Sequence, residues 1–443
     1  MTAGKRRCER FLEWVKERNS ASRPLIATGT EGISRAVVIP VLAESENLFD
    51  TLRSLAQNPA EELKDTLVIC VVNNRAEPST RADQITDNQL VLKHLEQIVQ
   101  GRCSTADPDG KIGVLRLAYV DASSPGQELG TKMGVGEARR IGLDTALGVL
   151  CRNGEPDGLL ISLDADTLVE PNYLQSLREH FADHDFGAGV VAYHHPLPDD
   201  PDRREAMILY ELFLRYHEMG LRSARSPYAW PTIGSTIVVR GDAYVAAGGM
   251  NRKQAGEDFY FIQQLVKTST VSRIDLTTVY PSNRASDRVP FGTGAGVGRH
   301  LAGDDGLFRV YHPEGYGVLG AWLALVQDCL EASAEELLEG AGAINPELEC
   351  FLSRRGFADI WPGLQQNVPD LFGLAAQFHR WFDAFKSLKL MHHLRDHGFP
   401  PMPVEEAITQ LLPSALAGAD ISGESNRLSH LLDQLRVACR QDL

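Results

Sequence analysis

Apolar runs of strand length alternate with amphipathic, helix-like segments from Ser34 onward. The runs are apolar at nearly every position, which is typical of strands buried on both faces of a parallel sheet. This alternation predicts an α/β fold in which crossover helices cover a mostly parallel, Rossmann-like sheet. The expected strands are Arg35–Val41, Thr66–Val72, Ile112–Val120, Gly158–Leu163, Ala188–Tyr193, Thr236–Arg240 and the closing pair Val279-Tyr280, with a long helix over Arg203–Arg222.

The pattern changes near residue 300, where helix-rich sequence punctuated by prolines replaces the strand-like runs. We therefore predict an N-terminal helical arm over residues 1–34, a nucleotide-binding α/β domain over residues 35–300 and a helical accessory domain over residues 301–443. A chain of 443 residues is long enough for such a division.

Composition narrows the expected partners and location. The net charge of −15 would repel a polyphosphate backbone, so we expect no nucleic acid partner. No apolar stretch reaches the roughly 18 residues of a spanning helix, so no transmembrane segment is expected. Seven scattered cysteines without CxxC spacing argue against a disulfide framework and a zinc knuckle, and favour a cytoplasmic location. The sequence leaves open whether the chain forms a homo-oligomer.

Polar residues follow the expected strands, at the ends where α/β sheets bind ligands. Glu44, Asn73 and Asp121 follow the first three runs, and Asp164 and Asp166 follow the fourth. Residues i and i+2 of a strand point the same way, so the two aspartates would face one cation. Mg²⁺ and Mn²⁺ prefer such carboxylates together with substrate phosphates. A polar turn that caps the next helix is the structural alternative.

Five short motifs occur in order along the chain: Val37-Val38-Ile39-Pro40 with Glu44, Val71-Val72-Asn73-Asn74, the helix start Gly134–Gly142, Asp164-Ala165-Asp166 and Gly256-Glu257-Asp258. The series resembles the family 2 glycosyltransferases and their relatives, which have the GT-A fold of the nucleotide-diphospho-sugar transferase superfamily. The resemblance covers about residues 35–290, so it implies that the predicted α/β domain is a GT-A domain. The family's Ala-Arg-Asn triplet is here Ala138-Arg139-Arg140, so only Arg139 carries over.

The resemblance implies where a nucleotide-diphospho-sugar donor binds. Its base and ribose would contact Pro40, Glu44 and Asn73. Asp164 would contact the ribose or a metal ion, and Asp166 would ligate the metal ion that bridges the diphosphate. A divalent cation held there, Mn²⁺ or Mg²⁺, would stabilise the charge that grows on the leaving diphosphate.

Basic residues near the predicted phosphate site come from two segments. Lys132 and Arg139 lie at the start of a predicted helix whose N-terminal amides can also face phosphate. The segment over residues 281–300 has glycine at every second position from Gly292 to Gly298, which predicts a mobile lid. Arg284 or Arg288 would supply its bidentate clamp, although a surface loop with incidental arginines fits the same pattern.

The last motif supplies the predicted catalytic group. By the resemblance, Asp258 takes the proton from the acceptor hydroxyl, with Glu257 as its substitute. Acidic residues in a first helical turn are also ordinary caps, so the upstream motifs are needed for this interpretation. The region of Trp230, Gly234 and Ser235 faces the acceptor in the family, and Trp230 is equally suited to a core position.

Four histidines are candidate metal ligands. The resemblance allows His300 or His312 as a third ligand beside the aspartates, and each is also explained as an ordinary polar residue. His393 and His397 share a helical face at the spacing of metal ligands. Because no HExxH pattern accompanies them and Lys389 lies nearby, we interpret that pair as a solvated helix end.

The predicted function is transfer of a sugar from a nucleotide-diphosphate donor to a hydroxyl-bearing acceptor by a metal-dependent hexosyltransferase. Inversion at the anomeric carbon is implied by family 2. The chain lacks the Gln-x-x-Arg-Trp sequence and membrane helices of the family's polymerases, so we expect a non-processive enzyme. The alternatives are a sugar-phosphate nucleotidyltransferase, which would need a glycine-rich, basic signature after the first strand, and a non-catalytic module that binds nucleotide sugars.

Overall fold

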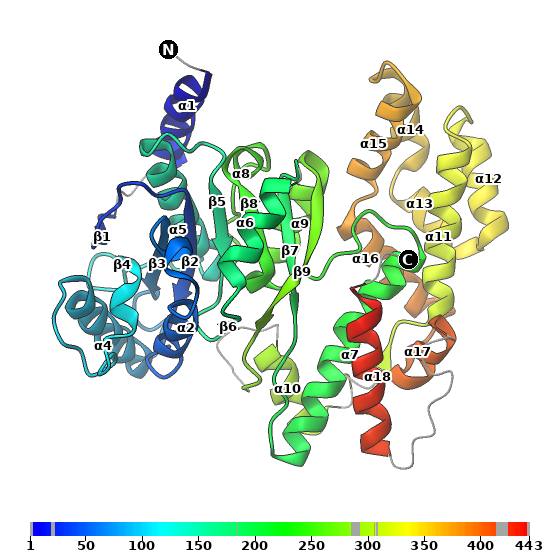
Figure 1. The fold of residues 1–443 in the computed structure, drawn as a ribbon. Helices are drawn as coiled ribbons and strands as arrows, with labels where there is room; N and C mark the ends of the chain where they lie inside the picture. The colour runs from blue at the N-terminus through cyan, green and yellow to red at the C-terminus, as the bar shows by residue number, and fades with distance from the viewer. Residues whose placement is uncertain are drawn as a thin grey trace. The chain divides into compact units, whose positions relative to one another are not determined.

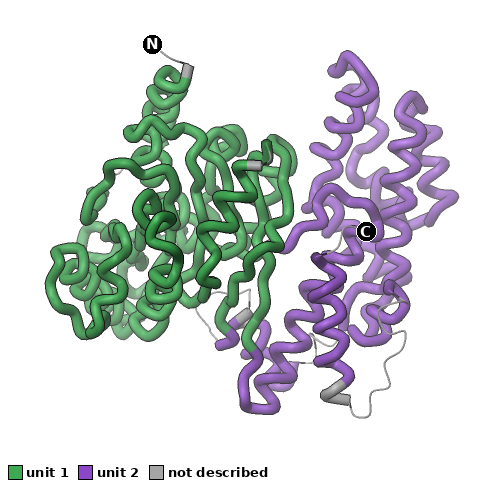
Figure 2. The backbone as a smooth tube through the Cα atoms, viewed as in Figure 1, with its two compact units in different colours: residues 1–196, 232–282 green, residues 197–231, 283–443 purple. Residues whose placement is uncertain are grey.

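The structure is a computed structural model that describes residues 3–18, 23–183, 185–284, 293–304, 306, 309–412 and 424–440. The chain forms two compact units (Figure 2). Residues 1–196 and 232–282 form the first, here called the sheet unit, and residues 197–231 and 283–443 form the second, the helical unit.

The sheet unit is built on one large sheet, which confirms the predicted α/β class. Its strands are β1 (Leu25–Ala27), β2 (Arg35–Val41), β3 (Thr66–Asn73), β4 (Arg116–Ala122), β5 (Leu159–Ser162), β6 (Leu168–Val169), β7 (Ala188–Tyr193), β8 (Ile237–Arg240) and β9 (Val271–Tyr280). Among the described residues the order is β1-β4-β3-β2-β5-β8-β7-β9-β6 (Figure 1). The run β4-β3-β2-β5 is parallel throughout, whereas β8 runs antiparallel to both of its neighbours.

The central strands show why the apolar runs predict them so closely. Every residue of β2 and β3 is buried, so neither strand has a polar face to interrupt its run. Pro40 is tolerated inside β2 because its side of the strand is not paired there. The carbonyl of Val38 accepts from Leu163, and Pro40, two residues on, faces the same side beyond the last paired residue of β5.

Helices of the sheet unit connect its strands and pack against them. They are α1 (Ala3–Arg18), α2 (Leu48–Leu55), α3 (Ala60–Leu63), α4 (Ala82–Val99), α5 (Val135–Arg152), α6 (Tyr173–Asp183), α8 (Gly241–Ala246) and α9 (Glu257–Thr268). α5 packs on β2 and β3, α4 on β3 and β4, and α6 on β9. The predicted strand Ile112–Val120 begins later than expected, because Ile112–Val114 forms a short 3₁₀ turn.

Residues 1–34 belong to the sheet unit, so they do not form the separate arm that we predicted. Cys8 and Phe11 of α1 are buried, and α1 packs on α5. Arg18 at its end pairs with Asp144 at 3.2 Å and donates to the carbonyl of Gly248 at 2.6 Å. β1 then extends the sheet as an antiparallel neighbour of β4. Contacts with residues far along the sequence thus attach the N-terminal segment to the sheet unit.

The helical unit begins earlier in the chain than the predicted boundary at residue 300. Its elements are α7 (Pro201–Ser223), α10 (Thr293–Leu301), β10 (Arg309–Val310), α11 (Pro313–Asp328), α12 (Ala334–Ile344), α13 (Pro346–Arg354), α14 (Phe357–Gln366), α15 (Leu371–Trp381), α16 (Ala384–Asp396), β11 (Met402–Pro403), α17 (Val404–Leu411) and α18 (Glu424–Ala438). α7 joins this unit because Met207 and Leu212 are buried in the same core as Trp322. Its buried Glu211 also pairs with Arg436 of α18 at 2.9 Å.

In the part of the chain that the structure describes, no helix combines the length and the apolar character needed to cross a membrane. All seven cysteines are free thiols.

Gly142 sets the distance between α5 and the sheet, which gives a stability prediction. A Cβ atom at this position would lie 2.2 Å from Cγ1 of Val38. We expect Gly142→Ala to lower the melting temperature measured by calorimetry, because overpacking a tight core costs about 1–3 kcal/mol. Gly148→Ala on the same helix is the matched control, since its Cβ would meet only the end of the Arg152 side chain at 3.5 Å. Equal melting temperatures for the two variants would contradict the close packing.

Candidate active site

A buried arginine joins three segments of the sheet unit. Arg139 of α5 donates from Nη2 to Asp164 Oδ1 at 2.5 Å, from Nη1 to Ser162 Oγ at 2.7 Å and from Nε to Glu257 Oε1 at 2.9 Å. Ser162 ends β5, Asp164 lies two residues beyond it, and Glu257 begins α9. The structure therefore brings the first aspartate of the Asp-Ala-Asp motif and the second acidic motif together on one cation.

Two glycines allow α5 and the start of α9 to come this close. A Cβ on Gly136 would lie 2.5 Å from the carbonyl oxygen of Lys253, and one on Gly134 would lie 2.9 Å from Cα of Gln254. The amide of Gly136 donates to that Lys253 oxygen at 3.2 Å. This amide of the helix start is thus used within the protein. The glycines of this motif serve packing between backbones.

Asp258 has the electrostatic environment of a base that works near neutral pH. It is half-buried in the first turn of α9, directly after Glu257. Burial and the neighbouring negative charge of Glu257 raise the pKa of Asp258 to about 7, against the smaller opposing effect of Arg139. A carboxylate with such a pKa can both hold and release a proton at physiological pH.

Glu257 and Asp258 therefore have different surroundings. The Glu257 side chain is 5% exposed and its Oε1 accepts from Arg139, so it holds the arginine in place. The Asp258 carboxylate accepts from the amide of Phe259 at 2.8 Å, within its own helix turn. Of the two acids predicted as catalytic, Asp258 is the better suited to exchange a proton with a ligand.

Asp164 and Asp166 are the residues predicted to hold a divalent cation, and binding of that cation stays a prediction. The Asp164 side chain is 30% exposed, and its Oδ1 accepts from Arg139 while Oδ2 is left to other partners. Asp166 is half-buried in the turn that the amide of Thr167 closes onto the carbonyl of Asp164 at 3.2 Å. Both residues offer carboxylate oxygens, the donors that Mg²⁺ and Mn²⁺ prefer. The same residues thus form the hydrogen-bonded turn and the predicted pair of metal ligands.

An unsatisfied hydroxyl lies beside this site. Ser235 is fully buried, and its Oγ has no hydrogen-bond partner among the described residues. The preceding residue, Gly234, packs so closely on Arg139 that a Cβ there would lie 2.1 Å from Nη2. A buried hydroxyl without a partner is costly unless a ligand satisfies it. The predicted role of Gly234 and Ser235 in binding the acceptor stays a prediction.

The residues after β2 and β3 form a hydrogen-bonded rim. Glu44 is buried and accepts from Asn47 Nδ2 at 3.1 Å. Asn73 donates from Nδ2 to the carbonyls of Val41 and Val71 at 2.9 and 3.2 Å, so its amide group fixes the neighbouring backbone. Pro40, Glu44 and Asn73 thus lie on adjacent strand ends, as the motif order predicts, and their contacts to a donor stay a prediction.

Sequence reasoning missed the network that supports this rim. The backbone amide of Ala43, a residue with φ of 52°, donates to Asn88 Oδ1 at 2.9 Å. Asn88 in turn donates to Asn74 Oδ1 at 3.0 Å, and Ser123 donates to the same oxygen. An alanine with a positive φ has a strained backbone, and this conformation persists only when neighbouring contacts stabilise it. Asn88 lies inside a long amphipathic helix, where nothing in the sequence marks it.

The remaining predicted residues belong to other segments of the chain. Lys132 is exposed on the segment before α5. Trp230 donates from Nε1 to the carbonyl of Pro227 at 3.0 Å and, like Arg284, belongs to the helical unit. Arg288 lies outside the described residues. The predicted glycine-rich lid is wrong in part, because Thr293–Leu301 forms α10.

The two candidate third ligands differ from each other. His300 lies in α10 of the helical unit. His312 is the N-cap of α11, and its Nδ1 accepts from the amide of Glu314 at 3.2 Å. A capping role accounts for His312 without a metal ion.

Comparisons with known proteins gave structural neighbours alone. No family model and no curated protein sequence matches the chain. The structure of S. aureus TarS 1-349 in complex with UDP-GlcNAc is similar at 13% identity and a TM-score of 0.38, over 91% of this chain and 90% of that one. M. tuberculosis glucosyl-3-phosphoglycerate synthase is similar at 14% identity and a TM-score of 0.33, over 62% of this chain and 81% of that one.

Arg139 gives the first prediction for the site. Replacing it by Met leaves Asp164 and Glu257 without their shared cation, and loss of one partner of a buried pair costs about 3–5 kcal/mol. We expect a fall of that size in the free energy of unfolding measured in urea. Arg102→Ala is the control, because the Arg102–Glu96 pair is more than 45% exposed on both sides and should change stability by less than about 1 kcal/mol. A comparable loss in both variants would show that Arg139 has no special structural role.

Asp258 gives a prediction on pH. Its pKa is raised from the ordinary 3.8 to about 7, so the folded state loses stability as pH rises through that window. Asp258→Asn removes the charge, and we expect it to raise the melting temperature more at pH 8 than at pH 5. Asp109→Asn is the control, since the exposed Asp109 pairs with Lys111, which lowers its pKa. A pH-independent effect of Asp258→Asn would refute the raised pKa.

Proposed function

We propose that the chain transfers a sugar from a nucleotide-diphosphate donor to a hydroxyl group of an acceptor. The observation that carries this proposal is the raised pKa of Asp258 beside the ion-pair chain Glu257–Arg139–Asp164. That arrangement provides a base and, at the end of β5, carboxylates for a diphosphate-bound cation. The order of the motifs along the chain supports the same function.

In the proposed reaction, Asp258 accepts the proton of the acceptor hydroxyl as that oxygen attacks the anomeric carbon of the sugar. The new carbon–oxygen bond forms while the bond to the donor's phosphate oxygen breaks, and the nucleoside diphosphate leaves with the bonding electron pair. Attack from the face opposite the leaving group inverts the configuration. Glu257 and Arg139 act as positioning residues, because they fix the start of α9 relative to β5.

Asp164 and Asp166 would hold a divalent cation, Mn²⁺ or Mg²⁺, which when bound would stabilise the negative charge on the departing diphosphate. Arg139 orients Asp164 through Oδ1, so the other oxygen keeps a fixed direction. Gly234 and Ser235 belong to the segment that we propose for acceptor binding. We propose a single transfer per acceptor and a hexosyl group as the sugar.

A turnover assay with a panel of nucleotide sugars tests this function, in the presence of Mn²⁺ and candidate hydroxyl acceptors. We expect Asp258→Asn to lower kcat by about 10²–10⁴-fold, because it removes the proton acceptor but retains size and shape. Donor binding, followed as a rise in melting temperature, should be retained. Asp109→Asn should have parental activity. If Asp258→Asn turns over at the parental rate, the proposed base is wrong.

The same assay separates the alternatives. A nucleotidyltransferase would release pyrophosphate from a nucleoside triphosphate and a sugar phosphate, whereas a binding module would bind a nucleotide sugar without turnover by the parent. Asp166→Asn should reduce the Mn²⁺-dependent part of donor binding. Donor binding that is equal in the parent and in Asp166→Asn, with and without Mn²⁺, would exclude the proposed role of Asp166.

A further inference from the structure

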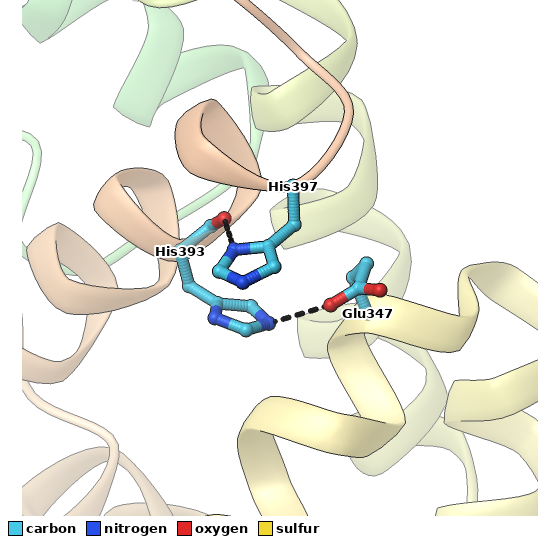
Figure 3. A group of neighbouring side chains, drawn as sticks. All are labelled: Glu347, His393 and His397. Atoms are coloured by element: carbon cyan, nitrogen blue, oxygen red, sulfur yellow. Dashed lines mark hydrogen bonds and ion pairs between the residues drawn. The ribbon is translucent and has the colours of Figure 1, made fainter.

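A second group of metal-ligand side chains lies in the helical unit, and it comes from two different helices. His393 lies in the last turn of α16, and His397 is the C-cap of that helix. Glu347 lies in the first turn of α13, which packs against α16. Figure 3 shows the carboxylate of Glu347 beside the two imidazole rings. We propose that Glu347, His393 and His397 form a zinc-binding site.

The spacing of the three ligand atoms is close to that of a metal site. One ligand atom from each residue lies within 4.8 Å of the others, and His393 Nε2 is 2.9 Å from Glu347 Oε2. Zinc bonds of about 2.0–2.2 Å in tetrahedral geometry place ligand atoms roughly 3.3–3.5 Å apart. The three ligand atoms are therefore near the separations that one zinc ion requires.

The tautomer of His397 is also set for a metal ion. Its Nδ1 is 2.8 Å from the carbonyl oxygen of His393, and a carbonyl only accepts, so Nδ1 carries the proton. The neutral ring then has its lone pair on Nε2. Histidines that bind metals commonly donate their other ring N–H to a backbone carbonyl in this way.

The two rings are held in a fixed arrangement. Their centroids are 4.2 Å apart with 28° between the ring planes, and the His393 ring also packs on Phe351. The hydrogen bonds from His393 to Glu347 and from His397 to the His393 carbonyl thus hold both imidazoles near one carboxylate.

The donor set selects the ion. Two imidazole nitrogens and one carboxylate oxygen suit Zn²⁺, whereas Mg²⁺ prefers oxygen alone. Three protein ligands leave a fourth position, and because His397 is exposed, water has access to it. When the ion binds, the proton on His393 Nε2 leaves that nitrogen, either for Nδ1 or for solvent.

Calorimetric titration with Zn²⁺ alone tests the site, using the full chain without a histidine tag. We expect the parent to bind one Zn²⁺ that His397→Ala and Glu347→Gln bind more weakly. Loss of an outer-shell partner costs roughly 10–100-fold in affinity, so loss of a ligand should cost at least as much. His392→Gln is the matched control on the same helix, because His392 is outside the ligand group and packs on Tyr311. It should bind Zn²⁺ like the parent.

Two readouts keep the result independent of folding. His397 is exposed and Glu347→Gln preserves shape, so metal-free variants should have the parental melting temperature and circular dichroism spectrum. Zn²⁺ should raise the melting temperature of the parent and of His392→Gln but not that of the ligand variants. Equal Zn²⁺ affinity in the parent and in His397→Ala, or no binding by the parent at millimolar Zn²⁺, would overturn the proposal and leave an ordinary histidine–carboxylate pair.

Discussion

The buried guanidinium of Arg139 is the constraint on which the candidate active site depends. A charge removed from water must be paired, and here the partners come from separate segments, Asp164 after β5 and Glu257 at the start of α9. Burial lowers the pKa of Arg139, but the two carboxylates raise it more, so the cation is stable where it lies. The pairing requirement therefore fixes the distance between the end of β5 and the start of α9.

That constraint also explains how two adjacent acids acquire different properties. Glu257 faces the cation, whereas Asp258 experiences the negative charge of Glu257 together with partial burial. Gly134 and Gly136 lack side chains that would clash with the backbone just before α9, so the start of α5 can lie close to it. Packing at the glycines thus allows the pairing with Arg139, whereas burial and the charge of Glu257 raise the pKa of Asp258 against the opposing effect of that arginine.

The sequence predicts the strands better than the units. The bounds of β2 were predicted to the residue, because a strand buried on both faces is apolar throughout. Strand alternation also predicts that Ser162 and Asp164 lie on one side of the chain, where both contact Arg139. The sequence does not predict that α7 belongs to the helical unit, because this depends on which core buries Met207 and Leu212. Likewise, the sequence shows that His393 and His397 share a helix face, but Glu347 joins them only through tertiary packing.

The two proposed metal sites differ in donor chemistry, and this difference has a physical consequence. Affinity for a nitrogen-containing site rises toward the end of the first transition series, whereas carboxylate oxygens hold Mg²⁺ and Mn²⁺ with substrate phosphates. Asp164 and Asp166 offer oxygen alone, and the site formed with His393 and His397 offers two imidazole nitrogens. A zinc ion held by the helical unit would therefore not need to compete with the ion that accompanies a donor diphosphate. Each proposed site can be lost without the other, because their ligands belong to different units.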